Sequence, residues 1–435
     1  MVTIFLLVFL CVGCILLLSW KSRRETTILP LGPTPLPILG NFLQLDQDDL
    51  LKSLIKVSKV YGPVFTVYLG LQKIVVLCGY EAVKEALVEH AEAFAGRGQV
   101  PVLSRFLKEH GIVFSNGERW KQLRRFTVTT LRNFGMGKGR MEEKIQVETL
   151  CLVEEFNKTE GRPSTFSALW LHRTQPVASN IHYLFPEIMD KIPGMHRKMA
   201  KIGLKIVDII KERIETQLAS FDASDPQNYI ECFLVKMEQP DFGIQIAFSP
   251  SQEKVHKEID RVVGQGRMPT VKDRNQMPYT TAVLNEIQRL ADVVPMNLPH
   301  FVTQDTHFRG YVIPKVRFRE RVPPGMGTYI YPLLNSVHYD KHHHANPEEF
   351  DPGRFLDSNG CLKKVEAFMP FSTGKRACLG EGLARMILFL FFTTILQKFT
   401  LTSPEPPEKI SIAPAFHNLT RIPPQYKLSM VPRQL

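Results

Sequence analysis

The chain has 435 residues, of which 44% are hydrophobic and 22% charged, and its formal net charge is +11. This composition excludes a disordered chain, and we prefer one large domain with a membrane anchor to two or three average domains. The positive charge favours an acidic partner or an anionic membrane surface. Nucleic acid is the rival interpretation, but the sequence has no zinc-finger spacing, basic zipper or aromatic ribonucleoprotein signature, so we expect no nucleic-acid partner.

The first predicted element is an uncharged run, VTIFLLVFLCVGCILLLSW, which is just long enough to cross a bilayer as a helix. Lys21, Arg23 and Arg24 follow it, and such cations stay in the cytoplasm, which places the N-terminus in the lumen. A cleaved signal peptide fits less well, because the charges follow the run and no small-residue cleavage site precedes them. We therefore predict a transmembrane anchor at residues 1–20 and a cytoplasmic body.

Residues 21–40 form a basic stop-transfer segment and a proline-rich hinge, because four prolines in LPLGPTPLPILGN impose a stiff, extended path. One domain then spans residues 41–435. It begins with an amphipathic helix, LLKSLIKVSKVYG, two β-rich runs, VFTVYLG and KIVVLCG, and a helix at residues 81–90. Helical patterns dominate afterwards, with short strands near residues 308–313 and 327–332. The predicted class is α+β, mostly α-helical, with a small β-rich N-terminal region.

Three polar motifs follow along the chain. In ERWKQLRRF, Trp120 and Arg124 share a helix face and present an indole N–H and a guanidinium to an anionic group. In EIQR, the i,i+3 spacing puts Glu286 and Arg289 on one face. In NPEEFDPGRF, Arg354 is suited to dock on Glu286 and close a buried network of three charges. Ordinary helix-face packing explains each motif alone, but all of them are much less likely to occur together in this order by chance.

The most informative stretch is FMPFSTGKRACLGEG at residues 368–382. It matches the pattern FxxGxRxCxG through Phe371, Gly374, Arg376, Cys378 and Gly380. An apolar helix, too short to span a membrane, follows at residues 386–396. A thiolate near a helix N-terminus is stabilised by the helix dipole, and glycines let a large planar cofactor approach the backbone. The motif predicts an iron–thiolate bond at Cys378, whereas a buried structural cysteine would need neither the glycines nor the arginine.

The other cysteines and histidines are less informative about function. The seven cysteines show no disulfide framework, which agrees with a cytoplasmic body. Lys341 and the three histidines after it could bind a metal, but they precede NPEEF in a polar stretch, so we interpret them as a solvated loop.

Together these segments resemble the cytochrome P-450 heme-thiolate monooxygenases, specifically the microsomal drug- and lipid-oxidising branch. The resemblance covers the anchor, the hinge, ERWKQLRRF, MPYTTAVLNEIQRL, LPHFVTQD, the Arg354 motif and the cysteine loop. It implies that Cys378 is the catalytic residue and the axial ligand of the heme iron, and that Glu286, Arg289 and Arg354 hold the proximal side together. It also implies a cofactor-binding set around the heme and its propionates: Arg97, Trp120, Arg124, His300, Phe371 and Arg376.

The resemblance further implies a reaction, insertion of one oxygen atom from O2 into apolar small molecules such as xenobiotics, fatty acids or other lipids. A thiolate ligand suits this chemistry because it favours O–O cleavage. The implied electron source is NADPH, through a flavoprotein NADPH-cytochrome reductase, with cytochrome b5 as a second candidate partner. The implied location is the endoplasmic reticulum membrane, with the catalytic domain on the cytoplasmic side. The basic face around Lys121, Arg125 and Arg132 either attracts the acidic reductase or is simply solvated.

The sequence also departs from the family pattern. The family has a long central helix with a small-residue bend and an acid–threonine pair that handle oxygen and its protons. Here ECFLVKMEQPDFGIQIAFSP runs directly into SQEKVHKEIDRVVG, so we expect this oxygen-activating helix to be missing near residue 250. We also expect missing material between residues 165 and 186 and an insertion at residues 316–326. The alternative function is therefore a non-catalytic or misfolded heme-binding isoform.

Overall fold

A computed structural model describes residues 29–46, 49–100, 111–133, 139–166, 205, 208, 250–316, 327–404, 416–417, 421–422 and 426–433. The predicted anchor, the beginning of the hinge, the segment that runs up to residue 250 and residues 317–326 of the predicted insertion lie outside the described residues. Within the described ranges, no helix combines the length and the apolar character needed to cross a membrane.

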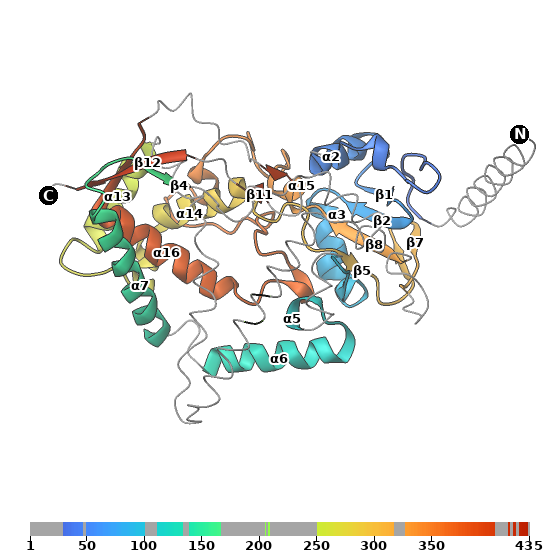
Figure 1. Ribbon diagram of the computed structural model, residues 1–435, viewed down its shortest axis with the longest axis horizontal. Coiled ribbons are helices and arrows are strands. Elements are labelled where there is room, and N and C mark those ends of the chain that lie inside the picture. Colours follow the sequence, from blue (N-terminus) through green and yellow to red (C-terminus); the bar gives the residue numbers. More distant parts are fainter. Residues whose placement is uncertain are drawn as a thin grey trace, which may run out of the picture.

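One end of the molecule is built on a five-stranded sheet of order β1-β2-β8-β5-β3 (Figure 1). Its strands are β1 (Val64–Leu69), β2 (Gln72–Leu77), β3 (Gly96–Arg97), β5 (His300–Phe301) and β8 (Thr328–Pro332). β1 and β2 form an antiparallel hairpin rich in β-branched residues, and Gly70 allows the turn with its φ of +62°. At the far edge, Arg97 pairs directly with His300. The sheet therefore brings together two predicted site residues that are distant in the sequence.

The helices next to this sheet have clear local causes. They are α2 (Leu50–Tyr61), α3 (Tyr80–Lys84) and α15 (Leu334–His338), with single turns at η2 (Phe42–Gln44), η3 (Glu85–Glu89) and η4 (Ala93–Ala95). Asp49 caps α2, because its side chain accepts a hydrogen bond from the Lys52 amide at 3.0 Å. The helix predicted at residues 81–90 is present as α3 followed by one π-helical turn, η3.

The other end of the molecule is helical (Figure 1). Its helices are α7 (Gly139–Asn157), α13 (Pro250–Val262), α14 (Pro278–Ala291) and α16 (Glu381–Lys398), with a turn at η5 (Val271–Gln276). The remaining helical segments are α5 (Gly111–Phe114) and α6 (Gly117–Asn133), which lie along the lower edge in Figure 1, and the turns η6 (Pro352–Phe355) and η7 (Gly374–Arg376). α16 packs against α7, α13 and α14 around a core that includes Ile145, Ile259, Ile287 and Leu390. The apolar helix predicted at residues 386–396 is longer than expected, because Glu381 and Arg385 pair at 2.9 Å across its first turn.

Short strands complete the fold. They are β4 (Ser164–Phe166), β6 (Thr306–Phe308), β7 (Tyr311–Ile313), β9 (Phe399–Thr402), β10 (Phe416–His417), β11 (Arg421–Ile422) and β12 (Tyr426–Pro432). β6 and β7 form a hairpin, and β4, β12 and β9 form a three-stranded sheet. The strands expected near residues 308–313 and 327–332 are therefore present as β6, β7 and β8.

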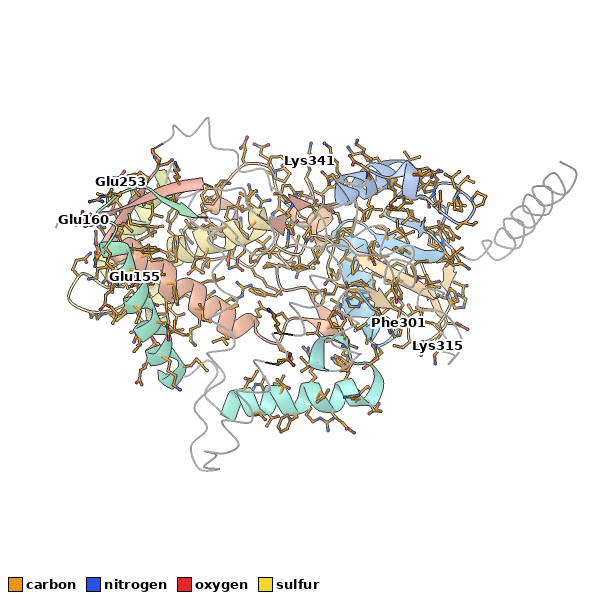
Figure 2. The ribbon with its side chains drawn as sticks, in the orientation of Figure 1. Glu155, Glu160, Glu253, Phe301, Lys315 and Lys341 are labelled. Atoms are coloured by element: carbon orange, nitrogen blue, oxygen red, sulfur yellow. The ribbon has the colours of Figure 1, made fainter. Side chains whose placement is uncertain are left out.

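Several charged side chains on the outside of the molecule form ion pairs with neighbours. Glu155, Glu160 and Glu253 lie at the helical end (Figure 2) and form ion pairs with Lys158, Arg162 and Lys257. Such exposed pairs contribute little stability, because solvent and salt screen their charges. The charges that define the site lie inside the molecule, between the sheet and the first turn of α16.

Candidate functional site

The predicted network of three charges is present in the interior. Glu286 and Arg289 on α14 are completely buried, and Arg289 donates from Nε to Glu286 Oε2 and from Nη2 to Oε1, each at 2.8 Å. Arg354 donates from Nε to Glu286 Oε1 at 3.0 Å. The Asp351 amide adds a further bond to Glu286 at 2.9 Å. The remaining Arg289 donors reach the carbonyls of His338, Pro347 and Glu349, so its guanidinium is fully hydrogen-bonded.

The cysteine loop turns tightly in front of α16. Cys378 is exposed, and its amide donates to the Phe371 carbonyl at 3.0 Å, which closes the loop. Gly374 has a φ of +73°, and a Cβ atom there would lie 1.8 Å from the Leu87 carbonyl oxygen. Only glycine fits this approach. Gly380 is the residue before α16, so the sulfur lies near the N-terminus of an 18-residue helix whose dipole favours a thiolate.

Arg376, in the same loop, is buried and reaches toward the sheet. Its Nε donates to the Ala95 carbonyl at 2.7 Å, and its Nη2 donates to the Ser115 carbonyl at 2.9 Å. The guanidinium lies 3.8 Å from the centre of the Trp120 ring. The Arg124 guanidinium lies on the same ring at 5.8 Å and donates to the Ala377 carbonyl at 3.0 Å. Trp120 therefore holds two cations beside the cysteine loop.

Arg97 brings a third cation into this region from β3. It is buried, and its Nη1 donates to the Leu298 carbonyl at 3.1 Å. In the part of the chain that the structure describes, no carboxylate pairs with Arg97, Arg124 or Arg376, and Arg97 Nε and Arg376 Nη1 are buried without a hydrogen-bond partner. Burial, followed by repulsion from neighbouring arginines, lowers the pKa of Arg97 to about 10 and that of Arg376 to about 9.

His300 lies in the same cluster. Its Nδ1 donates to the Phe94 carbonyl at 2.8 Å, and its buried Nε2 has no partner among the described residues. Burial, followed by the charge of Arg97, lowers the pKa of His300 well below its ordinary value. In the neutral ring Nε2 is an acceptor, so His300 donates to a carboxylate only after it takes up a proton, which a bound anion would favour.

Asn116 is a site residue that the sequence motifs do not reveal. Its Oδ1 accepts from the Arg97 amide at 2.7 Å and from Arg376 Nη2 at 3.0 Å, while its Nδ2 donates to the Arg97 carbonyl at 3.0 Å. It stands immediately before α6, where asparagine ordinarily caps a helix. That position is the available signal, but it does not indicate a bridge between two distant arginines.

Phe371 contributes to the loop rather than to the cation cluster. Its carbonyl accepts from the Cys378 amide, and its ring lies 5.2 Å from the Arg385 guanidinium on α16. The structure thus brings Arg97, Trp120, Arg124, His300 and Arg376 into one cluster and places Phe371 and Cys378 beside it. Glu286, Arg289 and Arg354 form a separate network.

The residue types at this site fit heme. Buried, unpaired guanidinium donors match two carboxylate groups, and an exposed thiol beside a helix N-terminus matches a thiolate ligand of iron. Gly374 meanwhile lets the loop approach the chain at Leu87. A neutral ligand would leave the cluster uncompensated, because buried cations without a counter-charge are strongly unfavourable.

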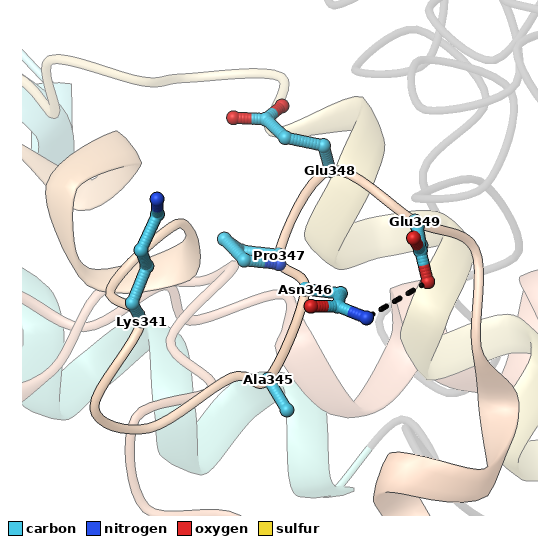
Figure 3. Close-up of a pocket in the computed structure, with 6 residues that line it drawn as sticks. All are labelled: Lys341, Ala345, Asn346, Pro347, Glu348 and Glu349. Atoms are coloured by element: carbon cyan, nitrogen blue, oxygen red, sulfur yellow. Dashed lines mark hydrogen bonds between the residues drawn. The ribbon is translucent and has the colours of Figure 1, made fainter.

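A surface hollow elsewhere lacks these features. It is lined by Lys341, Ala345, Asn346, Pro347, Glu348 and Glu349, and Asn346 donates to Glu349 at 3.2 Å (Figure 3). The adjacent histidines do not gather with other ligands, and within the described ranges no three His, Cys, Asp or Glu side chains are grouped to hold a metal. The interpretation of this stretch as a solvated loop is wrong for His344, which is buried because the chain folds it against the Ala367 carbonyl.

The mostly helical fold with small sheets, together with a cysteine loop before a buried helix, defines the class of heme-thiolate proteins. The chain belongs to the cytochrome P450 family, whose model matches residues 30–182 and 250–430. It is 43% identical to Cytochrome P450 2C44 of Mus musculus over 98% of each chain. It is also 43% identical to Cytochrome P450 2C23 of Rattus norvegicus over 97% of each, and 41% identical to Cytochrome P450 2H1 of Gallus gallus over 98% of each.

These relationships make the chain a microsomal, family-2-like member and a heme-thiolate monooxygenase. Heme iron is its cofactor, and its electrons come from NADPH by way of a reductase. The alignment with the mouse protein runs over 495 positions, whereas this chain has 435 residues, so the relative contains residues that this chain lacks.

Proposed function

We propose that Cys378 ligates the heme iron and that Arg97, Trp120, Arg124, His300 and Arg376 bind the heme propionates. The observation that carries this proposal is the buried pair of unsatisfied donors, Arg97 Nε and Arg376 Nη1, next to the exposed thiol. When bound, a thiolate-ligated heme supplies the iron at which O2 is activated. The protein's own part is to supply positive charge for the carboxylates and to hold the sulfur in place.

Each arginine has a separate task in this arrangement. Arg97 and Arg376 each have one buried donor without a partner among the described residues, so a carboxylate can fill both positions without breaking an existing hydrogen bond. Arg124 lies close enough to Cys378 to interact with it electrostatically. Asn116 fixes Arg97 and Arg376 relative to each other.

The test is the spectrum of the reduced protein with carbon monoxide. We expect the red-shifted Soret band of a thiolate-ligated heme in the unmodified chain and its loss in Cys378→Ala. Cys361→Ala is the matched control, because Cys361 is also an exposed free cysteine but lies outside the loop. Retention of the band in Cys378→Ala, or its loss in Cys361→Ala, would contradict the assignment.

We further propose that the substrates are apolar small molecules, such as xenobiotics, fatty acids or other lipids. The electron donor is an NADPH-cytochrome reductase, with cytochrome b5 as a second partner, and residues 1–20 anchor the protein in the endoplasmic reticulum membrane with its body in the cytoplasm. The apolar run at residues 2–20 and the cations after it support the anchor. Arg125 and Arg132 are exposed on α6 and support an acidic partner, whereas Lys121 is paired with Glu118 at 2.7 Å.

A last part of the proposal is that a segment including the family's central helix is missing before α13. The family match stops at residue 182 and resumes at residue 250, the residue at which α13 begins. Because positioned proton donors near the distal face speed oxygen chemistry, we expect low turnover in this chain. A version with a family-like helix inserted ahead of α13 should form clearly more product from a generic fluorogenic substrate with reductase present. Equal product from both chains would contradict this part alone.

A further inference from the structure

A buried histidine connects the two halves of the candidate site. His338, the last residue of α15, is 1% exposed, and its Nδ1 lies 3.0 Å from Asp292 Oδ1. On the other side of the ring, the Met369 amide donates to Nε2 at 3.2 Å. Because the amide is only a donor, Nε2 is the acceptor, and the ring proton is on Nδ1 and points to Asp292. Both nitrogens of one neutral ring are therefore used.

The acid on which this ring depends is itself firmly held. Asp292 ends α14 in the left-handed conformation, with a φ of +43°, and its Oδ2 accepts from Asn335 Nδ2 at 2.7 Å. Arg421 Nη1 lies 3.7 Å from the same oxygen. Asp292 is 2% exposed, so it offers His338 a fixed acceptor rather than a mobile surface carboxylate.

His338 also contacts the network of three charges and the cysteine loop. Arg289 Nη1 donates to the His338 carbonyl at 2.9 Å, so the backbone of His338 is bound to α14 as well as its ring. Met369, which the ring holds, is where the cysteine loop begins, and its carbonyl accepts from the Ser372 amide at 3.0 Å. Hydrogen bonds thus connect Arg289 and Asp292 through His338 to Met369 and Ser372, and the neighbouring Phe371 accepts from the Cys378 amide.

We propose that His338 is a positioning residue, whose neutral ring fixes the beginning of the cysteine loop to the end of α14. The inference rests on the proposed ligation of iron by Cys378. The acceptor at Nε2 acts directly on the loop, while the Nδ1–H bond to Asp292 keeps the ring in the tautomer that leaves Nε2 free to accept. Without that acceptor, the buried Met369 amide has no hydrogen-bond partner, and the beginning of the cysteine loop is no longer held to α15.

Two substitutions distinguish the hydrogen bond that the His338 ring accepts from the mere packing of its volume. His338→Gln puts an amide oxygen near the Nε2 position and keeps an acceptor for Met369. His338→Asn puts an amide nitrogen near the Nδ1 position, keeps the donor to Asp292 and removes the acceptor. The control is His344→Asn, a buried histidine of the same segment whose hydrogen bond, to Ala367 at 3.4 Å, does not involve the loop amide.

The experiment measures hydrogen exchange of the Met369 amide in the full heme-loaded chain and the rate at which the thiolate-type carbon monoxide band is lost. In His338→Asn we expect both rates to rise by about tenfold, as the loss of one buried hydrogen bond requires. In His338→Gln and His344→Asn we expect both rates to stay within about twofold of the unmodified chain.

Two outcomes would overturn the proposal. If His338→Asn and His338→Gln behave alike, the acceptor at Nε2 does not fix the loop. If His338→Asn accelerates amide exchange but not loss of the band, the ring does not position the thiolate. Failure of the proposed function is distinguishable, because the unmodified chain would then show no thiolate band while Met369 exchange still responds to His338→Asn.

Discussion

Buried arginines occur in two neighbouring regions of this protein, and their surroundings differ. At α14, the guanidiniums of Arg289 and Arg354 both meet the Glu286 carboxylate, and the other Arg289 donors reach backbone carbonyls. Beside the cysteine loop, Arg97 and Arg376 have no carboxylate partner among the described residues, and each retains one buried donor without a partner. The charges of the first, complete region are paired within the protein, whereas those of the second, incomplete region have no counter-charge among the described residues.

The difference distinguishes arginines that stabilise the fold from arginines that are suited to bind a ligand. A buried charge without a counter-charge costs several kcal/mol, so a fold retains one only where something else supplies the opposite charge. The lowered pKa values of Arg97 and Arg376, about 10 and about 9, express that cost. A buried arginine with its own carboxylate, by contrast, needs no ligand.

The largest expected effect comes from breaking the complete region. Glu286→Gln keeps the side-chain shape but leaves two buried guanidiniums without a counter-charge, so we expect a loss of about 3–5 kcal/mol in the free energy of unfolding. Urea unfolding of the heme-loaded protein measures it. Glu348→Gln, on an exposed residue nearby, should change the free energy of unfolding by less than about 0.5 kcal/mol. Equal effects in the two variants would show that the network is not a structural element.

A smaller effect on stability is expected in the incomplete region. Arg97→Met keeps most of the packing and removes a cation that has no counter-charge in the described part of the chain, so the heme-free protein should lose at most about 1 kcal/mol of stability. Heme dissociation should nevertheless speed up by about tenfold, since a charge-assisted bond to the propionate is lost. Lys375→Met is the control, because Lys375 is exposed and pairs with Glu92 at 2.7 Å. If heme dissociates from Arg97→Met at the same rate as from the unmodified chain, Arg97 does not bind heme and the two regions do not differ as proposed.

A third expected effect is a pH dependence next to the complete region. Burial lowers the pKa of His344 from its ordinary 6.5 to about 4, with a further contribution from Arg289. Between those pH values the unfolded chain binds the proton and the folded chain does not, so the free energy of unfolding falls as the pH falls through this window, by up to about 1.4 kcal/mol per pH unit. His344→Gln should flatten the slope of unfolding free energy against pH. An unchanged slope would show that His344 does not stay neutral in the folded protein.

The sequence predicts the complete region better than the incomplete one. The spacing of Glu286 and Arg289 follows from helix periodicity, so the amino-acid sequence alone is enough to predict their contact. The bridging role of Asn116 is not predictable in this way, because it depends on a strand pairing that sets Arg97 opposite His300 and on the loop that delivers Arg376. Long-range pairing of two-residue strands leaves almost no local signal.

The boundaries of the helices are likewise only partly predictable from the sequence. The apolar residues of α16 predict most of the helix but not its first turn, because Glu381 and Arg385 are polar and hold each other at the surface. His338 carries no local signal for a related reason, since its two partners lie at the end of α14 and in the cysteine loop. Helix periodicity predicts contacts within an element, whereas contacts between elements, apart from the predicted one between Arg354 and Glu286, need the fold.

The central claim is that the unpaired arginines are completed by the heme carboxylates. The most direct measurement compares the affinity of the heme-free protein for heme and for heme dimethyl ester, which keeps the iron and the ring but lacks both charges. We predict that the ester binds at least about tenfold more weakly than heme. In Arg97→Met the difference in affinity between heme and its ester should be smaller, because one guanidinium that would pair with a propionate is missing. Equal affinity for heme and its ester in the unmodified chain would contradict the claim.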